Sequence, residues 1–126
     1  MKNVIATTSA PAAIGPYSQA IMVDGFLYAS GQLGMNPTTG NLEGDSIQSQ
    51  AKQALANVKA ILAEAGMQMS DVVKTTVFLS DISLFAEFNA VYAEAFPGPG
   101  APARSCVAVK GLPKNALVEI EVIAHK

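Results

Sequence analysis

The stretch PARSCVAV (residues 102–109) places Arg104 and Cys106 inside a run that is otherwise typical of a buried strand. A guanidinium is permanently charged, so this position is costly unless an anion pairs with it. Its planar fork fits a carboxylate through two parallel hydrogen bonds. The sequence therefore leaves two interpretations of Arg104. Either it forms a structural ion pair with Glu119 or Glu121, or it clamps the carboxylate of a small ligand.

Other side chains could contribute chemistry if Arg104 holds a ligand. Glu119 would act on that ligand or on a water molecule beside it. A lone cysteine such as Cys106 is more often a small buried residue than a nucleophile. Asn89 interrupts an aromatic stripe, where an asparagine usually satisfies backbone or a subunit contact and a ligand role is the alternative.

Two turns contain further residues that could contact a ligand. Tyr17 follows the rigid pair Gly15-Pro16, so its ring is directed, although packing is the usual fate of such a ring. Backbone amides around Ser30 and Gly31 could donate to an anion, which is a weak signal by itself. The pair Gly31 and Gly34 is no dinucleotide fingerprint, because no helix opens directly after it.

Composition narrows the classes of function. Of the 126 residues 50% are apolar and 14% are charged, so we expect part of the surface to meet another subunit. The net charge of −2 gives no general attraction to nucleic acid or anionic membrane. With one cysteine, no visible signal peptide and no membrane-spanning apolar run, the expected compartment is the cytoplasm.

The residue types for metal or triad chemistry are scarce. His125 is the only histidine and stands one residue from the end of the sequence. A histidine-based zinc site or a Ser-His-Asp triad therefore cannot be assembled. The sequence predicts neither a metal nor a cofactor.

The elements that must position these residues follow from periodicity and turn chemistry. Residues 1–7 predict an edge strand, and 17–31 predict a hairpin that turns at Asp24-Gly25. A helix is expected from Asp45 or Ser46, either of which can cap it, to Gly66. Further elements are a strand at 72–80, a helix at 83–96 with Ser83 as N-cap and its aromatic residues in the core, and strands at 103–110 and 117–124.

This order, βββαβαββ, predicts an α+β fold of one domain over residues 1–126, with two helices on one face of a mixed sheet. Alternation along 117–124 puts Val118 and Ile120 in the core and Glu119 on the opposite face. The same reasoning puts Val107 in the core and Arg104 and Cys106 on the helix-free face. We therefore expect Arg104, Cys106 and Glu119 to share that face, which is either polar or buried between subunits.

Four separated stretches resemble the RidA (YjgF-like) family of reactive-intermediate deaminases, in order and over essentially the whole chain. They are APAAIGPYSQA (10–20), SGQLGMNPTTG (30–40), FNAVY (88–92) and PARSCVAVKGLPKNALVEIE (102–121). The last stretch carries the family's most specific pattern. The stretch FPGPGAPARS (96–105) departs locally from the family pattern. Its prolines and glycines affect the shape of the entrance to the family's substrate cleft, and hence which substrate side chains are preferred.

The resemblance implies a chorismate-mutase-like fold and a homotrimer with three clefts between neighbouring subunits. It implies hydrolysis of 2-imino acids, such as 2-iminobutanoate and 2-iminopropanoate, to 2-keto acids and ammonia without metal or cofactor. By position, Arg104, Glu119 and Tyr17 would be catalytic, and the substrate would also contact the residues that line the cleft, which are Ser30, Gly31, Asn89 and Cys106. For Cys106 the backbone carbonyl is the more plausible contributor.

Two other functions remain as alternatives. The same cleft could bind a keto or amino acid as a non-enzymatic metabolic sensor, because clamp residues serve both roles. RNA binding or cleavage has been proposed for some relatives of the family. The acidic charge balance and the absence of a basic-aromatic patch argue against RNA.

Overall fold

The computed structural model describes residues 1–126 and confirms the predicted α+β class. The two helices and six of the strands occur in the predicted order, and one short strand, β4, is added between the hairpin and the first helix. The elements are β1 (Asn3–Ile5), β2 (Ala20–Val23), β3 (Phe26–Ala29), β4 (Gln32–Leu33), α1 (Ile47–Glu64), β5 (Val72–Leu79), α2 (Phe85–Ala95), β6 (Ala103–Ala108) and β7 (Val118–His125).

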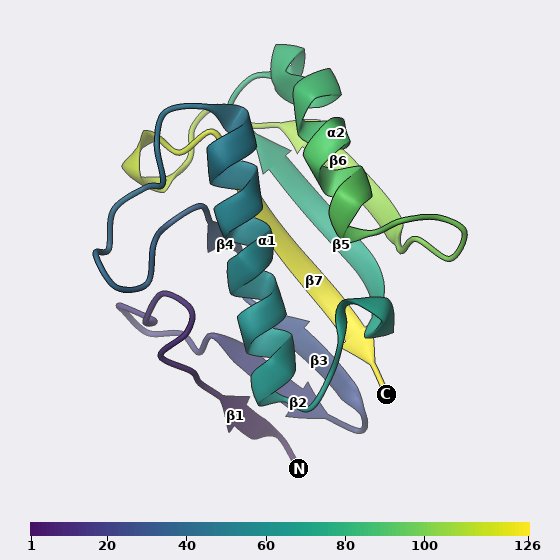
Figure 1. Cartoon of the computed structure of the whole chain (residues 1–126). Helices are drawn as coiled ribbons and strands as arrows, with labels where there is room; N and C mark the ends of the chain where they lie inside the picture. Colours follow the sequence, from purple (N-terminus) through teal and green to yellow (C-terminus); the bar gives the residue numbers. More distant parts are fainter.

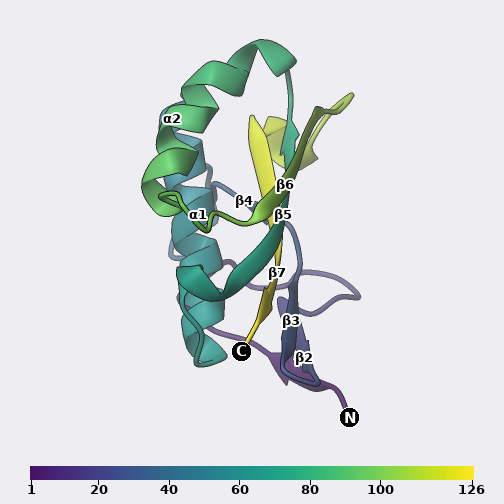
Figure 2. The ribbon, with the colours of Figure 1, turned by 90° about the vertical axis from the view of Figure 1, so that its right-hand side faces the viewer.

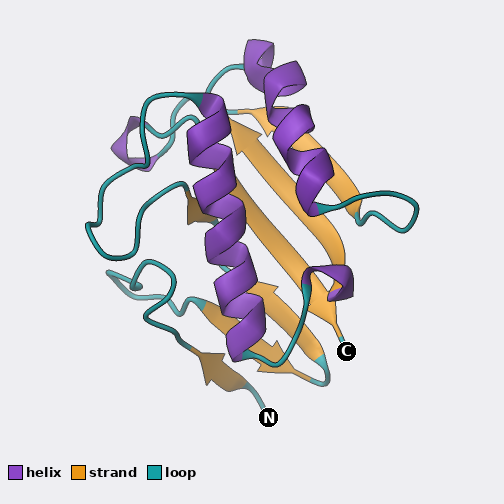
Figure 3. Ribbon diagram, in the orientation of Figure 1, coloured by secondary structure: helices purple, strands orange, loops and turns teal.

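All seven strands belong to one sheet, in which β7 occupies a central place (Figures 1 and 3). The strand order is β1-β2-β3-β7-β5-β6, and β4 also pairs with β7. Every pairing is antiparallel except that of β5 with β6, which is parallel. The sheet is therefore mixed, and β6 forms one of its edges.

Both helices lie on the same side of the sheet, as Figure 2 shows. Between them and the strands is a core of 22 buried apolar residues. The alternate residues of β7 that were predicted to face this core do so, because Val118, Ile120 and Val122 are buried. Glu119 and Glu121 consequently point to the helix-free side, as the alternation predicted.

Local sequence explains where the first elements turn and stop. Asp24 and Gly25 have φ of 51° and 81°, the left-handed pair that joins the two strands of a tight hairpin. Ser46 caps α1, since its side chain accepts a hydrogen bond from the Ser49 amide at 3.0 Å. Gly66 has φ of 74° just after the helix, which fits a glycine stop.

The start of the second helical segment differs from the prediction. The cap is Asp81 and not Ser83, because the Asp81 carboxylate accepts from the Ser83 amide at 2.8 Å. Hydrogen bonding by the Ser83 side chain, and then by its amide, lowers the pKa of Asp81. A short 3₁₀ turn, Ile82–Leu84, then leads into α2. The aromatic stripe is also only partly core, since Phe85 is 37% exposed.

The side-chain directions predicted for β6 are wrong. Parallel pairing places Arg104 beside Thr75 and Cys106 beside Val77, and both of these β5 residues are fully buried on the helix side. Arg104 and Cys106 therefore face α2, whereas Val107 points to the other face of the sheet. The prediction placed the more apolar alternate residues of β6, such as Val107, in the core. The register of β6 with β5 instead decides which residues face the helices.

The helix-free face keeps large apolar side chains in contact with solvent in the single chain. Val107 is 45% exposed and Tyr28 is 46% exposed. Polar residues lie among them, including Lys74, whose ammonium donates to Ser105 Oγ at 3.0 Å. In the structure no helix is both long and apolar enough to cross a bilayer.

Candidate functional site

The guanidinium of Arg104 lies against α2 and is held by uncharged groups. Its Nη1 donates to Asn89 Oδ1 at 2.6 Å. Its central carbon lies 4.6 Å from the centroid of the Tyr92 ring and 5.4 Å from that of Phe85. Cation–π contacts of this kind favour a guanidinium over an aromatic face.

No carboxylate pairs with Arg104. Asn89 is the side chain to which it donates, and Glu119 and Glu121 lie on the opposite face of the sheet. The interpretation of Arg104 as a structural ion pair with either glutamate is therefore wrong. A partly buried cation whose remaining N–H groups have no acidic partner is suited to bind an external anion.

Cys106 is adjacent to this group but is poorly suited to nucleophilic chemistry. Burial raises the pKa of its thiol, and the opposing effect of the Arg104 charge is smaller. The thiol, which is free, is therefore mainly protonated near neutral pH. This agrees with the expectation that its side chain is a small packing residue.

A second group of candidate residues surrounds Glu119. Tyr17, Gly31 and Glu119 line a cavity of about 340 Å³. Gly31 and Glu119 touch, because a Cβ added to Gly31 would lie 2.7 Å from Glu119 Cδ. The remaining lining residues come mainly from the 11–19 loop, β4 and the turn before β7: Pro11, Ala12, Ile14, Gln19, Gln32, Leu33, Met35, Pro113 and Lys114.

A register change in the sheet creates the space for this contact. Tyr28 pairs with Ile123 and Gln32 pairs with Ile120, so β3 and β4 advance four residues while β7 advances three. The extra residue is accommodated at Ser30-Gly31, as in a β-bulge. A glycine at this point lets the backbone approach the carboxylate of Glu119 closely.

The surroundings of Glu119 favour its protonated form. Burial raises the pKa of the carboxyl group above its ordinary value, and the nearby negative charge of Glu121 raises it further. A carboxyl group with such a pKa exchanges protons closer to neutral pH than an exposed glutamate. That property suits a general base or acid.

Both the hydroxyl and the amide of Ser30 form hydrogen bonds within the chain. Its hydroxyl donates to the carbonyl of Ser18 at 2.6 Å, and its amide donates to the carbonyl of Gln19 at 2.9 Å. The amide is therefore not free to bind an anion. Ser30 instead ties the bulge to the segment that carries Tyr17, whose own amide closes a tight turn onto Gly15 O at 2.9 Å.

The predicted residues thus divide into two groups on opposite faces of one sheet. Arg104, Asn89 and Cys106 lie on the helix side at the edge strand β6. Tyr17, Gly31 and Glu119 lie together around the cavity at β4 and β7. The expectation that Arg104, Cys106 and Glu119 share a face is wrong within one chain.

The sequence reasoning missed three residues around Arg104: Thr75, Phe85 and Tyr92. A signal was present, because Phe85, Asn89 and Tyr92 follow the i, i+4, i+7 spacing of a single helix face. An asparagine between two aromatic residues on such a face indicates that a polar group lies opposite it and needs a hydrogen-bond partner. Which strand would supply that group could not be read from the helix alone.

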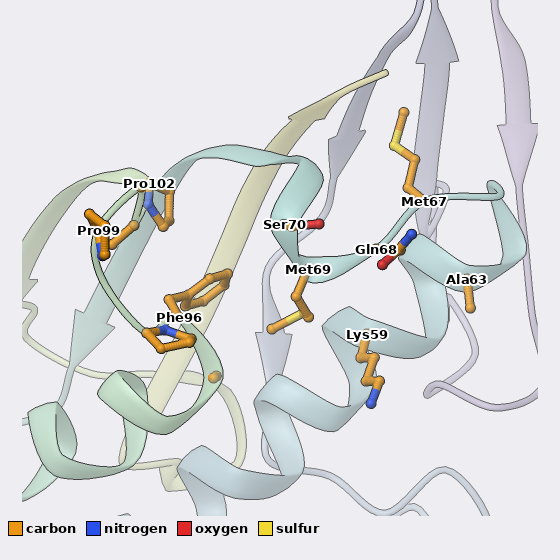
Figure 4. A pocket seen from close by; sticks show the side chains of 13 residues that line it. Lys59, Ala63, Met67, Gln68, Met69, Ser70, Phe96, Pro99 and Pro102 are labelled. Carbon is orange, nitrogen blue, oxygen red and sulfur yellow. The ribbon is translucent and has the colours of Figure 1, made fainter.

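The largest cavity lies away from both groups (Figure 4). It has a volume of about 610 Å³ and is formed by the end of α1, the segment after it and the proline-rich loop before β6. Lys59, Gln68 and Ser70 are the polar side chains among its lining residues. The chain also contains no cluster of three or more His, Cys, Asp or Glu residues arranged to hold a metal ion.

Comparison with known proteins gives matches over the whole chain. Residues 7–126 match the family described as Endoribonuclease L-PSP. The chain is 54% identical over 123 residues to a candidate regulator named AldR from Lactococcus lactis, covering 98% of this chain and 97% of that protein. It is 49% identical over 126 residues to the 2-iminobutanoate/2-iminopropanoate deaminase of Escherichia coli K12, covering 98% of both.

Comparison with solved structures gives a match to the same family. A member of the Rid protein family from Yersinia pestis superposes with a TM-score of 0.97 at 52% identity, covering all of both chains.

Proposed function

Because this chain belongs to the Endoribonuclease L-PSP family, which includes the RidA proteins that its motifs resemble, we propose that it hydrolyses 2-imino acids to 2-keto acids and ammonia. The substrates are small enamine and imine intermediates such as 2-iminobutanoate and 2-iminopropanoate. The reaction takes place in the cytoplasm, which suits a chain with a single reduced cysteine.

One observation carries this proposal. Arg104 is partly buried, is supported by Asn89 and two aromatic rings, and has no acidic partner in its own chain. Leaving such a cation without an anion is costly, and the carboxylate of a 2-imino acid would supply one.

The site is completed by a second copy of the chain. A ligand on Arg104 cannot reach Glu119 of the same chain, because the sheet separates them. The apolar residues on the helix-free face and the edge position of β6 support an interface at this place. In the proposed homotrimer, Arg104 of one subunit faces the cavity of Tyr17, Gly31 and Glu119 of the next.

The chemistry requires little beyond positioning. A protonated imine has an electrophilic carbon that water attacks without covalent help from the protein. Arg104 fixes the carboxylate and so presents this carbon toward the Glu119 cavity. Good orientation alone can lower a barrier by roughly 7–11 kcal/mol.

Glu119 transfers the protons. Its carboxylate takes a proton from the attacking water as the C–O bond forms, and the protonated acid returns it to the amino group. Glu119 then takes the hydroxyl proton as the C=O bond forms and the C–N bond breaks, and ammonia leaves with the electron pair of that bond. The ammonia takes up this proton, so the products are the keto acid and an ammonium ion. Such general acid–base catalysis contributes about 10²–10⁴-fold. Tyr17 closes the wall of the cavity and hydrogen-bonds the imine nitrogen or the water.

The test follows imine decay directly. Purified protein is mixed with a threonine dehydratase, and the 2-iminobutanoate released is measured by trapping it with a nucleophile. Wild type should speed its loss, and Arg104→Ala should not. Arg104→Lys should also be poor, because an ammonium cannot reproduce the two-pronged contact. If Arg104→Ala cleared the imine as fast as wild type, the clamp would be wrong.

A second candidate function is ligand binding without catalysis. The 54% identity to a candidate regulator supports considering it. Both functions need the Arg104 clamp, but a sensor needs no proton transfer by Glu119. A protein that binds pyruvate yet leaves the lifetime of 2-iminobutanoate unchanged would be a sensor.

The family description names an endoribonuclease, so RNA is included as a control substrate. The chain has 8 Lys and Arg against 10 Asp and Glu, which gives no general attraction for phosphates. We expect no RNA cleavage that survives further purification. Cleavage that co-purified with the protein and was lost in the Arg104→Ala variant would contradict this.

A further inference from the structure

Tyr92 forms the surface on which the guanidinium of Arg104 rests. The Tyr92 ring is the nearer of the two rings that this cation contacts, at 4.6 Å against 5.4 Å for Phe85. Tyr92 is 7% exposed, whereas Phe85 is 37% exposed. A buried ring is the stiffer support, because its neighbours restrict its rotation.

The hydroxyl of Tyr92 is anchored as well. It forms a hydrogen bond of 2.8 Å with Thr75 Oγ1, and Thr75 has no exposed surface. Thr75 is also the residue of β5 that pairs with Arg104 of β6. The strand that sets the backbone position of Arg104 therefore also fixes the ring beneath its side chain.

We propose that Tyr92, held by Thr75, is a positioning residue that sets the direction of the Arg104 fork. The inference rests on the proposed function, since it concerns the same carboxylate clamp. The ring fixes the plane of the guanidinium, and Asn89 fixes its rotation within that plane. The remaining N–H groups then point in one direction before any ligand arrives, which lowers the entropy lost on binding.

The first test compares two truncations on the same helix stripe. Tyr92→Leu removes the support of Arg104. Phe96→Leu is the matched control, because the tilted Phe96 ring, with its centroid 4.9 Å from that of Tyr92, is not one of the rings beneath Arg104, and leucine keeps an apolar side chain beside Tyr92. We expect Tyr92→Leu to raise KM for 2-iminobutanoate about tenfold, because the guanidinium loses its support and holds the carboxylate less well. The fall in kcat should be smaller than the rise in KM, since a substrate that is bound still reaches Glu119. Phe96→Leu should leave KM near its wild-type value.

The second test separates the anchor from the ring and avoids a large cavity. Tyr92→Phe and Thr75→Val each break the hydrogen bond but keep the ring. Each should raise KM by about threefold. Thr75→Ser retains the hydroxyl and should restore the wild-type KM, which a purely structural loss of packing would not predict.

Pyruvate binding, measured by calorimetry, keeps the positioning role distinguishable from the deaminase activity. If the wild type binds pyruvate but does not hydrolyse the imine, the proposed function fails while the same variants still test the clamp through pyruvate affinity. Equal changes in Tyr92→Leu and Phe96→Leu would overturn the positioning role and leave the deaminase intact. A wild type that neither binds pyruvate nor clears the imine would overturn both.

Discussion

Arg104 lies on an edge strand beneath α2, whereas Glu119 lies on the central strand β7 and on the opposite face of the sheet. Arg104 is surrounded by neutral and aromatic side chains that hold it in place. Glu119 borders an open cavity built from loops and from a bulge in the sheet. One region is arranged to keep a charge fixed, and the other leaves room for a small molecule.

This contrast assigns different tasks to the two regions. A rigid cation without an acid partner provides affinity for a carboxylate. A carboxyl group with a raised pKa beside a cavity provides proton transfer. The proposed enzyme therefore separates binding from chemistry within each chain and recombines them between chains.

The largest effect is expected from Glu119→Gln. The amide cannot accept the proton from water, so kcat should fall by about 10²–10⁴-fold. Pyruvate affinity should change little, because Arg104 still holds the carboxylate. Imine decay and calorimetry on the same preparation measure the two quantities. A large loss of pyruvate affinity would show that binding and chemistry are not separated.

Mixing two inactive variants tests whether the two regions meet between copies. Arg104→Ala and Glu119→Gln are unfolded together in equal amounts and refolded. If each site takes Arg104 from one copy and Glu119 from another, random assembly gives about one quarter of the sites both wild-type residues. About one quarter of wild-type activity should then return.

The control for this mixture is each variant refolded alone, which should stay inactive. No recovery in refolded mixed oligomers would place both residues of a site in one chain. The mass of the assembly in solution, measured by light scattering, checks that oligomers have formed and whether three copies are present.

A smaller effect is expected from Gly31→Ala. Its new Cβ would lie 2.7 Å from Glu119 Cδ, so the carboxyl group must move aside. Displacing a catalytic group by about 1 Å can cost about 10²-fold in rate, whereas the flexible side chain yields at little cost in stability. Gly111→Ala is the matched control, because a Cβ there meets nothing within 4 Å. Equal activity of the two variants, measured with their thermal melting, would contradict the contact.

The most subtle prediction concerns pH. Glu119 must be ionised to accept a proton, so kcat/KM should fall as the pH drops through its raised pKa. The negative charge of Glu121 contributes to that rise, and Glu121→Gln should therefore move the acid limb of the pH profile to lower pH. Glu64→Gln, at the far end of α1, should leave it in place. An unchanged limb in Glu121→Gln would exclude the coupling.

Much of the fold could be predicted because its signals are local. The Asp24-Gly25 turn, the Ser46 cap and the Gly66 stop each depend on a few neighbouring residues. The β7 alternation was equally clear, since its core residues are all apolar and two glutamates, Glu119 and Glu121, lie between them. The two-residue strand β4 escaped because nothing in Gln32–Leu33 distinguishes it from the adjoining turns.

The candidate site could be predicted residue by residue but not in its arrangement. The face of β6 depends on its pairing with β5, which alternation within PARSCVAV does not contain. Val107 is more apolar than Arg104, so burial by hydrophobicity gave the wrong face. The use of the Ser30 amide within its own chain likewise depends on a contact eleven residues away, with Gln19.

The absence of an acidic partner for Arg104 also has a consequence for turnover. A 2-imino acid and its 2-keto product carry the same carboxylate, and a fork that recognises this group distinguishes poorly between them. In the proposed enzyme the product would therefore compete for the site, and clearance would slow as keto acid accumulates. Selectivity must come from the neighbouring cavity, where an imine nitrogen and a ketone oxygen present opposite hydrogen-bonding demands to Tyr17 and Glu119.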